Sequence, residues 1–280
     1  MNNIQNFTDA LIDKGIVPAR AIIADGLLHR APVEGDKAGT LNLAYVLHLD
    51  GTPTGWFHHF KTGVTGSWSA SGKREPMTAA MRKQLEYARE VRQQEQAKAH
   101  QDAAQKAYWI WGQSEPITDP SRHPYLARKC INPHSARLYK GALVIPIYDE
   151  ANQLVNLQFI NADGTKRFLS GGRKKGCCSI IGETTETILV CEGWATGASL
   201  HEATGHYVIV AMDAGNLKPV GEIVRSQYPT AKIIACADND PVGIEKATVA
   251  AFACNGLMIA PPTEGTDFND FINSGGVVYG

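Results

Sequence analysis

The chain has 280 residues, of which 44% are hydrophobic, enough for one large or two modest domains that each bury a core. Its formal net charge of −1 does not exclude nucleic acid as a partner, because a basic groove and an acidic site would cancel in the total. No run approaches the roughly 18 apolar residues of a membrane span. The N-terminus also lacks a secretory signal, so a cytoplasmic location is expected.

Residues 1–75 are predicted to form a small β-rich domain. The apolar runs 41–51 and 55–63 flank a turn and predict a hairpin. No C-x-x-C pair occurs among the six cysteines, so a zinc ribbon is not expected here. Four aromatic residues of this region would either stack on single-stranded bases or form the core: Trp56, Phe57, Phe60 and Trp68.

Residues 76–112 are predicted to be a helical linker. Pro76 suits a first helical turn, and the stretch after Val91 has almost no apolar stripe. This pattern favours a solvated connecting helix over a coiled coil. Trp109 and Trp111 are expected to dock the end of the helix on the next domain.

Residues 113–185 are predicted to form a mixed α+β subdomain with strands at 143–149, 154–161 and 177–182. Between the last two strands lies a basic segment interleaved with glycines. Such a segment can neutralise phosphates and let the backbone approach them, although an isolated one is more often a solvated hairpin. The candidate nucleic-acid or nucleotide ligands are Lys166, Arg167, Arg173, Lys174 and Lys175.

From residue 186 to residue 280 the pattern alternates between apolar strands and helices. The expected strands are 188–193, 206–213, 231–240 and 257–262. Strands this uniformly apolar indicate a parallel sheet with helices on both faces. The fold class is therefore α/β.

Acidic residues follow each of these four strands. The carboxyl ends of parallel strands meet at one edge of a sheet, where functional groups gather. Carboxylates brought together there repel one another unless a cation joins them, and magnesium prefers such oxygen ligands. The candidate ligands are Glu192, Asp213, Asp238, Asp240 and Asp267, with Asp270 beside them.

Two of these residues have alternative roles. Asp213 belongs to Asp-Ala-Gly-Asn, which is also a natural turn, and Asp267 could cap the last helix.

Three motifs resemble those of TOPRIM domains. CEGWATGASL, with Glu192, is similar to the first motif, ADNDPVGIEKA, with Asp238 and Asp240, to the second, and GTDFNDF to the third acidic element of TOPRIM primases. One departure is Thr196, which stands where many primases carry an aspartate. The order of a basic segment before these motifs also resembles DnaG-like primases of phages and plasmids, over most of residues 113–280.

This resemblance implies a DNA primase, a nucleotidyltransferase that synthesises short RNA primers on single-stranded DNA. It implies two magnesium ions on Glu192, Asp238 and Asp240, with Mn²⁺ as an alternative, aided by Asp267 and Asp213. One ion would lower the pKa of the attacking 3′-hydroxyl and the other would stabilise the leaving pyrophosphate. The partners would be template DNA, ribonucleoside triphosphates and a replicative helicase. The alternatives are a non-catalytic nucleic-acid-binding module and a metal-dependent TOPRIM nuclease.

Overall fold

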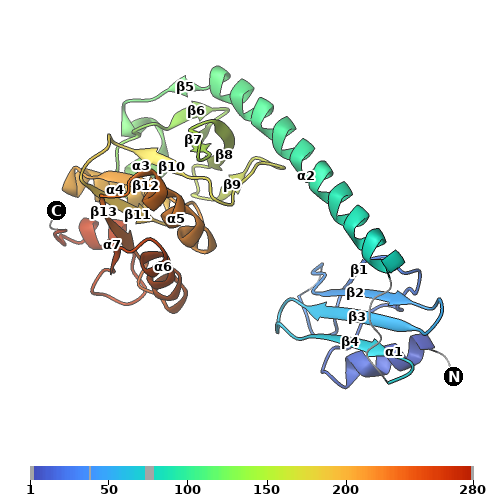
Figure 1. The fold of residues 1–280 in the computed structure, drawn as a ribbon. Helices are drawn as coiled ribbons and strands as arrows, with labels where there is room; N and C mark the ends of the chain where they lie inside the picture. Colours follow the sequence, from blue (N-terminus) through green and yellow to red (C-terminus); the bar gives the residue numbers. More distant parts are fainter. Residues whose placement is uncertain (1–2, 38, 73–78, 279–280) are drawn as a thin grey trace. The chain divides into compact units, whose positions relative to one another are not determined.

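The computed structural model describes residues 3–37, 39–72 and 79–278, with the backbone alone over 79–89. The chain forms two compact units, Met1–Tyr87 and Ala88–Gly280 (Figure 1). No helix in the described ranges is long and apolar enough to cross a membrane.

The first unit is an antiparallel sheet with one helix packed on it. The strands are β1 (His29–Ala31), β2 (Leu43–His48), β3 (Thr54–His59) and β4 (Thr65–Ser69), in that spatial order. The pairing of β2 with β3 confirms the predicted hairpin. Helix α1 (Asn3–Ile12) was not expected in a region predicted as strands and turns. Its Phe7 and Leu11 are fully buried in the core of the unit.

Helix α2 (Ala79–Gln113) covers most of the predicted linker, and the predicted start at Pro76 lies outside the described residues. Its last turns are anchored by Ala103, Ala107 and Ile110, which are buried in a core cluster of the second unit. Trp111 packs against this cluster, as predicted. Trp109 is 60% exposed, but its ring lies edge-on to that of Tyr139, with centroids 6.4 Å apart, so it also contacts the following subdomain, as predicted.

The second unit begins with an antiparallel sheet. Its strands, in spatial order, are β5 (Glu115–Pro116), β6 (Arg137–Tyr139), β7 (Ala142–Tyr148), β8 (Leu154–Ile160) and β9 (Lys166–Phe168). The short helices η1 (Pro120–Arg122) and α3 (Pro124–Lys129) lie between β5 and β6 in the chain. The two long central strands, β7 and β8, are almost entirely buried.

The last sheet has the spatial order β10 (Ser179–Ile181), β12 (Tyr207–Val210), β11 (Thr187–Cys191), β13 (Lys232–Cys236), β14 (Leu257–Ile259). The last four are mutually parallel, whereas β10 runs antiparallel to β12. The helices are α4 (Trp194–Thr204), η2 (Ala214–Asn216), α5 (Leu217–Gln227), α6 (Pro241–Ala253) and α7 (Phe268–Asn273).

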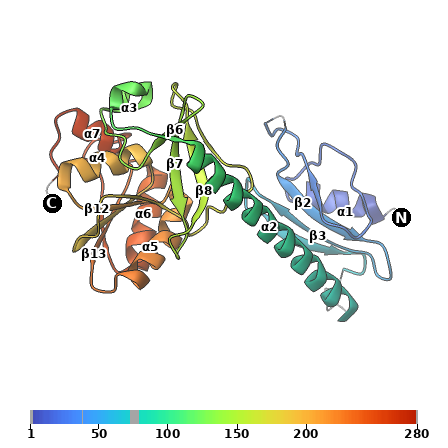
Figure 2. The ribbon, with the colours of Figure 1, turned by 90° about the horizontal axis from the view of Figure 1, so that it is seen from above.

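Helices cover both faces of this sheet. Residues of α4 and α7 share one core cluster with the sheet, and residues of α5 and α6 share another (Figure 2). The predicted α/β fold with a preceding mixed subdomain and a β-rich N-terminal unit is confirmed. Residues 179–181, which lie before the predicted boundary at residue 186, form an edge strand of this sheet. The division into segments 1–75, 76–112, 113–185 and 186–280 stays a prediction.

Candidate active site

Glu192 and Asp238 lie at the carboxyl ends of neighbouring parallel strands. The last residues of β11 and β13, Cys191 and Cys236, are paired in register, and the two acidic residues follow them by one and two positions. The chain leaves β11 towards α4 on one face of the sheet and leaves β13 towards α6 on the other. A crevice opens between strands at such a reversal, and ligands of open α/β sheets bind there.

Asp240 and Asp238 are held differently although they are two residues apart. Asp240 is the N-cap of α6, and its Oδ1 accepts hydrogen bonds of 2.8 Å from the backbone N–H groups of Val242 and Gly243. Asp238 has a buried Oδ1 without a hydrogen-bond partner. A Cβ at Gly243 would lie 2.4 Å from the carbonyl oxygen of Asp238, so only glycine lets α6 begin this close to the strand end.

Asp213 and Asp267 each cap a short helix, as the alternative reading of the sequence allowed. Asp213 accepts a 2.9 Å hydrogen bond from the N–H of Gly215, and Asp267 accepts one of 2.8 Å from the N–H of Asp270. The N–H of Ala214, in the turn that Asp213 caps, donates to Glu192. Capping occupies one oxygen of each aspartate and leaves the other available to a ligand.

The carboxylates raise one another's pKa. Burial is the largest cause for Asp238, and Glu192, Asp267 and Asp240 add repulsion, which together raise the pKa of Asp238 to about 6. The pKa of Glu192 is also raised, first by burial and then by the charges of Asp213 and Asp240. The edge therefore holds negative charge that its own residues do not neutralise.

Two lysines face this negative charge. Lys166, on β9, is attracted to Asp267, Asp238 and Glu192. Its side chain reaches solvent, yet the surrounding protein, followed by the charge of Lys129, lowers its pKa. Lys129, at the end of α3, has its Nζ 3.2 Å from Asp270 Oδ1 and 4.0 Å from Asp267 Oδ2. The sequence predicted Lys166 but not Lys129, because nothing in the segment HPYLARKCI marks its lysine as a neighbour of the last helix.

The residues at this edge offer the type of ligand that a divalent cation such as magnesium prefers. Their side chains offer carboxylate oxygens, one of which, in Asp238, is buried and unpartnered. The neighbouring thiols of Cys191 and Cys236 are not competing ligands, because complete burial raises their pKa far above the usual range. Within the described ranges, no three Asp, Glu, His or Cys side chains are grouped closely enough to hold a metal ion as they stand. Thr196 is 2% exposed and adds no second acid to the first motif.

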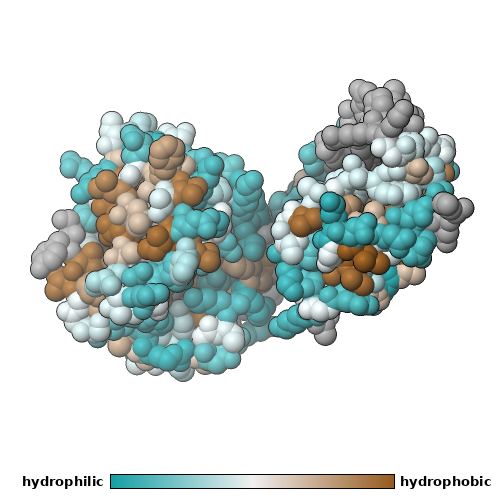
Figure 3. Space-filling model, turned by 90° about the horizontal axis from the view of Figure 1, so that it is seen from below, coloured by the Kyte–Doolittle hydropathy of each residue, from teal (hydrophilic) through white to brown (hydrophobic). Residues whose placement is uncertain are grey.

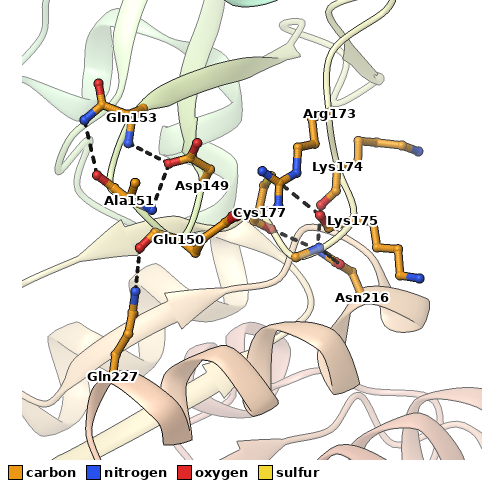
Figure 4. Close-up of polar contacts among 11 residues, drawn as sticks. Asp149, Glu150, Ala151, Gln153, Arg173, Lys174, Lys175, Cys177, Asn216 and Gln227 are labelled. Carbon is orange, nitrogen blue, oxygen red and sulfur yellow. Dashed lines mark hydrogen bonds and ion pairs between the residues drawn. The ribbon is translucent and has the colours of Figure 1, made fainter. Parts of the chain in front are cut away.

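The part of the predicted basic segment that follows β9 forms a loop whose backbone is held by two buried asparagines, of which Asn216 is shown in Figure 4. The Oδ1 of Asn216 accepts from the N–H of Gly176 at 2.8 Å, and its Nδ2 lies 2.8–3.1 Å from the carbonyl oxygens of Lys174, Cys177 and Ala211. Asn156 donates to the carbonyl of Arg173. Asn216 stands at the N-cap position of α5, but its side chain makes no capping bond and instead fixes this loop.

The basic side chains do not form one equivalent cluster. Arg173 donates to Glu150 at 2.6 Å, so its charge is engaged within the protein. The Nζ of Lys174 lies 4.8 Å from the centroid of the Phe168 ring, and Lys175 is exposed. Arg167 stacks over Phe159 at 4.4 Å.

A cleft of about 880 Å³ lies beside this loop. It is lined by residues that include Gln96 and His100 of α2, Lys174, Lys175 and Ile223. None of the five candidate metal ligands lines it, so the cleft and the acidic edge are separate features. Of the predicted basic residues, Lys166 therefore faces the acidic edge, while Arg173, Lys174 and Lys175 line the cleft.

The acidic edge lies in a segment with a known family signature, since residues 187–277 match the family model described as the Toprim domain. This segment is a Toprim domain. The match includes all five candidate metal ligands and the parallel strands that carry them, which confirms the resemblance seen in the three motifs.

The Toprim domain and most of the residues before it also resemble curated proteins. The chain is 34% identical over 258 residues to a DNA primase TraC of Escherichia coli, in a match that covers 85% of this chain and 24% of that protein. A second DNA primase TraC of Escherichia coli is 34% identical over 266 residues, or 87% of this chain and 18% of that protein. The chain thus spans a quarter or less of these relatives.

The solved structures that resemble this chain are more distant. A chain from a complex of bacteriophage T7 lagging-strand DNA polymerase with primase domains aligns with a TM-score of 0.42 and 15% identity, covering 60% of this chain and 90% of that one. The zinc-binding and RNA polymerase domains of Aquifex aeolicus primase give a TM-score of 0.39 and 14% identity, covering 98% and 82%.

Proposed function

We propose that this chain is the part of a DNA primase that synthesises short RNA primers on a single-stranded DNA template. The observation that carries the proposal is the 34% identity to proteins named DNA primase, which extends over 85% of this chain. That match is much longer than the 91 residues of the Toprim family match at 187–277, and at 85% of the chain it includes the basic loop. The reaction would be nucleotidyl transfer from ribonucleoside triphosphates, with a replicative helicase as a further partner.

Glu192, Asp238 and Asp240 would hold magnesium, or manganese in its place, with help from Asp267 and Asp213. The support is the unpartnered oxygen of Asp238 together with the mutual repulsion that raises the pKa of Asp238 and of Glu192. When bound, such cations lower the pKa of the attacking 3′-hydroxyl and stabilise the leaving pyrophosphate.

The chain's own residues would position the substrates. The ammonium of Lys166 faces the carboxylates, where it would attract the phosphates of an incoming nucleotide. Lys129 bridges Asp267 and Asp270 and would keep α7 beside the edge. The other basic residues of this segment follow Lys166 in the chain and precede the Toprim domain. They would contact the phosphates of the template or the nucleotide, and they are Arg167, Arg173, Lys174 and Lys175.

Incubation of the protein with single-stranded DNA, ribonucleotides and Mg²⁺ tests the proposal directly. Short RNA products are expected on a denaturing gel, and Asp240→Asn should reduce their yield at least about 100-fold, as removal of a key electrostatic group commonly does. Asparagine keeps the Oδ1 that caps α6, so the variant should remain folded. Alanine would remove this cap at a cost of about 1 kcal/mol, so it is the less specific change.

Glu245→Gln is the matched control, because Glu245 is an exposed carboxylate on the same helix, paired with Lys246. Its primer yield should equal that of the wild type. Full yield from folded Asp240→Asn would overturn the assignment of the acidic edge. Shortened DNA without RNA products would instead indicate a nuclease, and binding without either product would indicate a non-catalytic module.

A further inference from the structure

The sheet of the first unit has one face that its own helix does not cover. Side chains alternate along β2 and β3, and Leu43, Tyr45 and Phe57 lie in the core with Phe7 of α1. A Cβ at Gly55 would lie 2.4 Å from the Phe7 ring, which places α1 directly on this inner face. The intervening positions on the strands therefore project to the opposite, outer face.

A row of rings occupies this outer face along β3 and the residue after it. The rings of Trp56 and His58 are nearly parallel, with an angle of 9° and centroids 6.3 Å apart. The ring of Phe60 meets His58 edge-on at 4.5 Å, and the guanidinium of Arg30, from β1, lies 4.0 Å above the Phe60 ring. Trp56 is 44% exposed and Phe60 is 51% exposed. We refer to Arg30, Trp56, His58 and Phe60 as the outer aromatic row.

The sequence left open whether four aromatic residues of this unit stack on bases or form its core. The structure places two of them in the core and two on the outer face. Phe57 is 2% exposed, and Trp68 packs edge-on against Phe7 at 5.9 Å, so both belong to the core. Trp56 and Phe60 do not contribute to that core. The core therefore does not account for their presence.

Exposed apolar side chains alone would not mark a site. Figure 3 shows apolar patches on both units, and single exposed residues of this kind are common on protein surfaces. The outer aromatic row differs because its neighbouring rings contact one another, with Trp56 parallel to His58 and Phe60 edge-on to it. These rings occupy successive outward positions of β3 and the residue after it, and they carry a cation at one end.

The charge around the row suits a polyanion. The four strands, all described, contain no Asp or Glu, whereas they carry Arg30 and several histidines. Two aspartates beside the strands are already engaged, since Asp25 accepts from the His29 ring at 2.7 Å and Asp36 is paired with Lys61 at 2.7 Å. A flat aromatic surface without competing negative charge is the usual platform for unpaired bases.

We propose that the outer aromatic row binds single-stranded nucleic acid, with bases stacked on Trp56 and Phe60 and with Arg30 beside the phosphodiester backbone. This contact adds a second nucleic-acid site to the proposed primase and does not depend on catalysis. Every base has a π-face, so the row would bind with little sequence preference. In DNA and RNA alike the contact is made by the base.

The test is equilibrium binding of a labelled single-stranded oligonucleotide to the full chain. Trp56→Ala and Phe60→Ala should each weaken binding by about 5- to 150-fold, the loss of one stacked base. Trp56→Phe should restore most of the affinity, because phenylalanine keeps a ring. Phe252→Ala is the matched control, since Phe252 is a 90% exposed aromatic residue on α6 in the other unit.

Deoxy and ribo oligonucleotides of one sequence distinguish the two sources of bases, and circular dichroism checks the fold of each variant. Wild-type affinity in both alanine variants would overturn the proposal. So would a change in their oligomeric state at unchanged affinity, which would assign the row to a second copy of the chain.

Asp240→Asn separates this inference from the proposed function, because it should lose primer synthesis while it retains oligonucleotide binding. Weakened binding by the row variants would support the aromatic row even if the wild type made no primers.

Discussion

The sheet of the Toprim domain and the sheet of the N-terminal unit carry their candidate functional groups in different places. In the Toprim domain, helices bury both faces of the parallel sheet, so polar groups gather where the strands end. In the N-terminal unit, α1 covers one face of an antiparallel sheet, and the other face keeps exposed rings in mid-strand. A sheet covered on both faces can bind a ligand only at the ends of its strands, whereas a sheet covered on one face can bind a ligand on the other face.

The first test of this comparison displaces the acidic residues at the ends of the parallel strands. Gly243→Ala would place a methyl group 2.4 Å from the carbonyl oxygen of Asp238, so α6 or the strand end must shift. Overpacking of this kind costs about 1–3 kcal/mol. We expect a lower thermal midpoint and loss of primer synthesis. Gly205→Ala is a control for stability alone, because Gly205 has open space but a φ of +70° and lies at the opposite end of α4 from Glu192.

An unchanged midpoint and unchanged primer yield in Gly243→Ala would mean that the carboxylates do not need this close approach. A lower midpoint at full yield would show that the packing matters and the position of Asp238 does not.

The second change loosens the basic loop while it leaves the acidic residues in place. Asn216→Ala removes the partner of the Gly176 N–H and of three carbonyl oxygens. Burying unsatisfied polar groups costs about 1–3 kcal/mol, and we expect chemical denaturation to show a loss of this size. Gln105→Ala, which removes an exposed amide side chain from α2, provides the comparison. If the two variants were equally stable, the asparagine would not be what holds the loop.

How far the sequence predicts these features depends on how far apart the interacting residues lie in the chain. Each strand-end carboxylate was visible because the apolar run before it is local and continuous. Lys129 was missed, because its partner Asp270 lies 141 positions later. The pairing of Arg173 with Glu150 was also not predicted, because Glu150 belongs to a turn 23 positions earlier.

Short elements were also hard to predict. Helix α1 precedes a region dominated by strand signals, and its apolar residues Phe7 and Leu11 are too few for a clear helical pattern. The antiparallel edge strand β10 has three residues, which fix neither its direction nor its sheet.

The third test uses the pH dependence of stability to measure the burial and repulsion that act on the carboxylate of Asp238. The pKa of Asp238 is about 6 instead of the ordinary 3.8, so the folded protein binds this proton more tightly than the unfolded chain. The stabilising effect of the proton is complete below pH 3.8 and is lost as the pH rises through about 6.

Asp238→Asn, which cannot ionise, should therefore be more stable than the wild type at pH 8, by about 1 kcal/mol after screening by solvent. The difference should shrink towards pH 5 in thermal denaturation without divalent ions. A constant difference between the two pH values would contradict the repulsion among the carboxylates. Asp163→Asn, on an exposed turn, controls for loss of one charge.

The smallest expected effect concerns the lysines of the basic loop. Lys174 and Lys175 line the cleft, whereas Arg173 is engaged with Glu150. Replacing both lysines with alanine should reduce the slope of log K against log [salt] for single-stranded DNA by about 1.4, from two contacts of about 0.7 each. The row variants should leave this slope unchanged, because stacking involves no phosphate. A slope unchanged by the lysine variant would mean that the loop makes no phosphate contact.

The short turn η2 connects the acidic edge directly to the basic loop along the chain. Asp213 begins it at the acidic edge, and Asn216, three residues later, holds the basic loop. Because only three positions separate Asp213 from Asn216, the distance between the acidic edge and the basic loop is fixed by this turn. A shift of the loop would therefore also move Asp213. Substitutions at Ala214 or Gly215 are tolerable if they keep the turn, but an inserted or deleted residue would place one end out of register. Among homologous chains, we therefore expect length variation to be absent from this turn and to accumulate elsewhere, in exposed connections such as the one between β8 and β9.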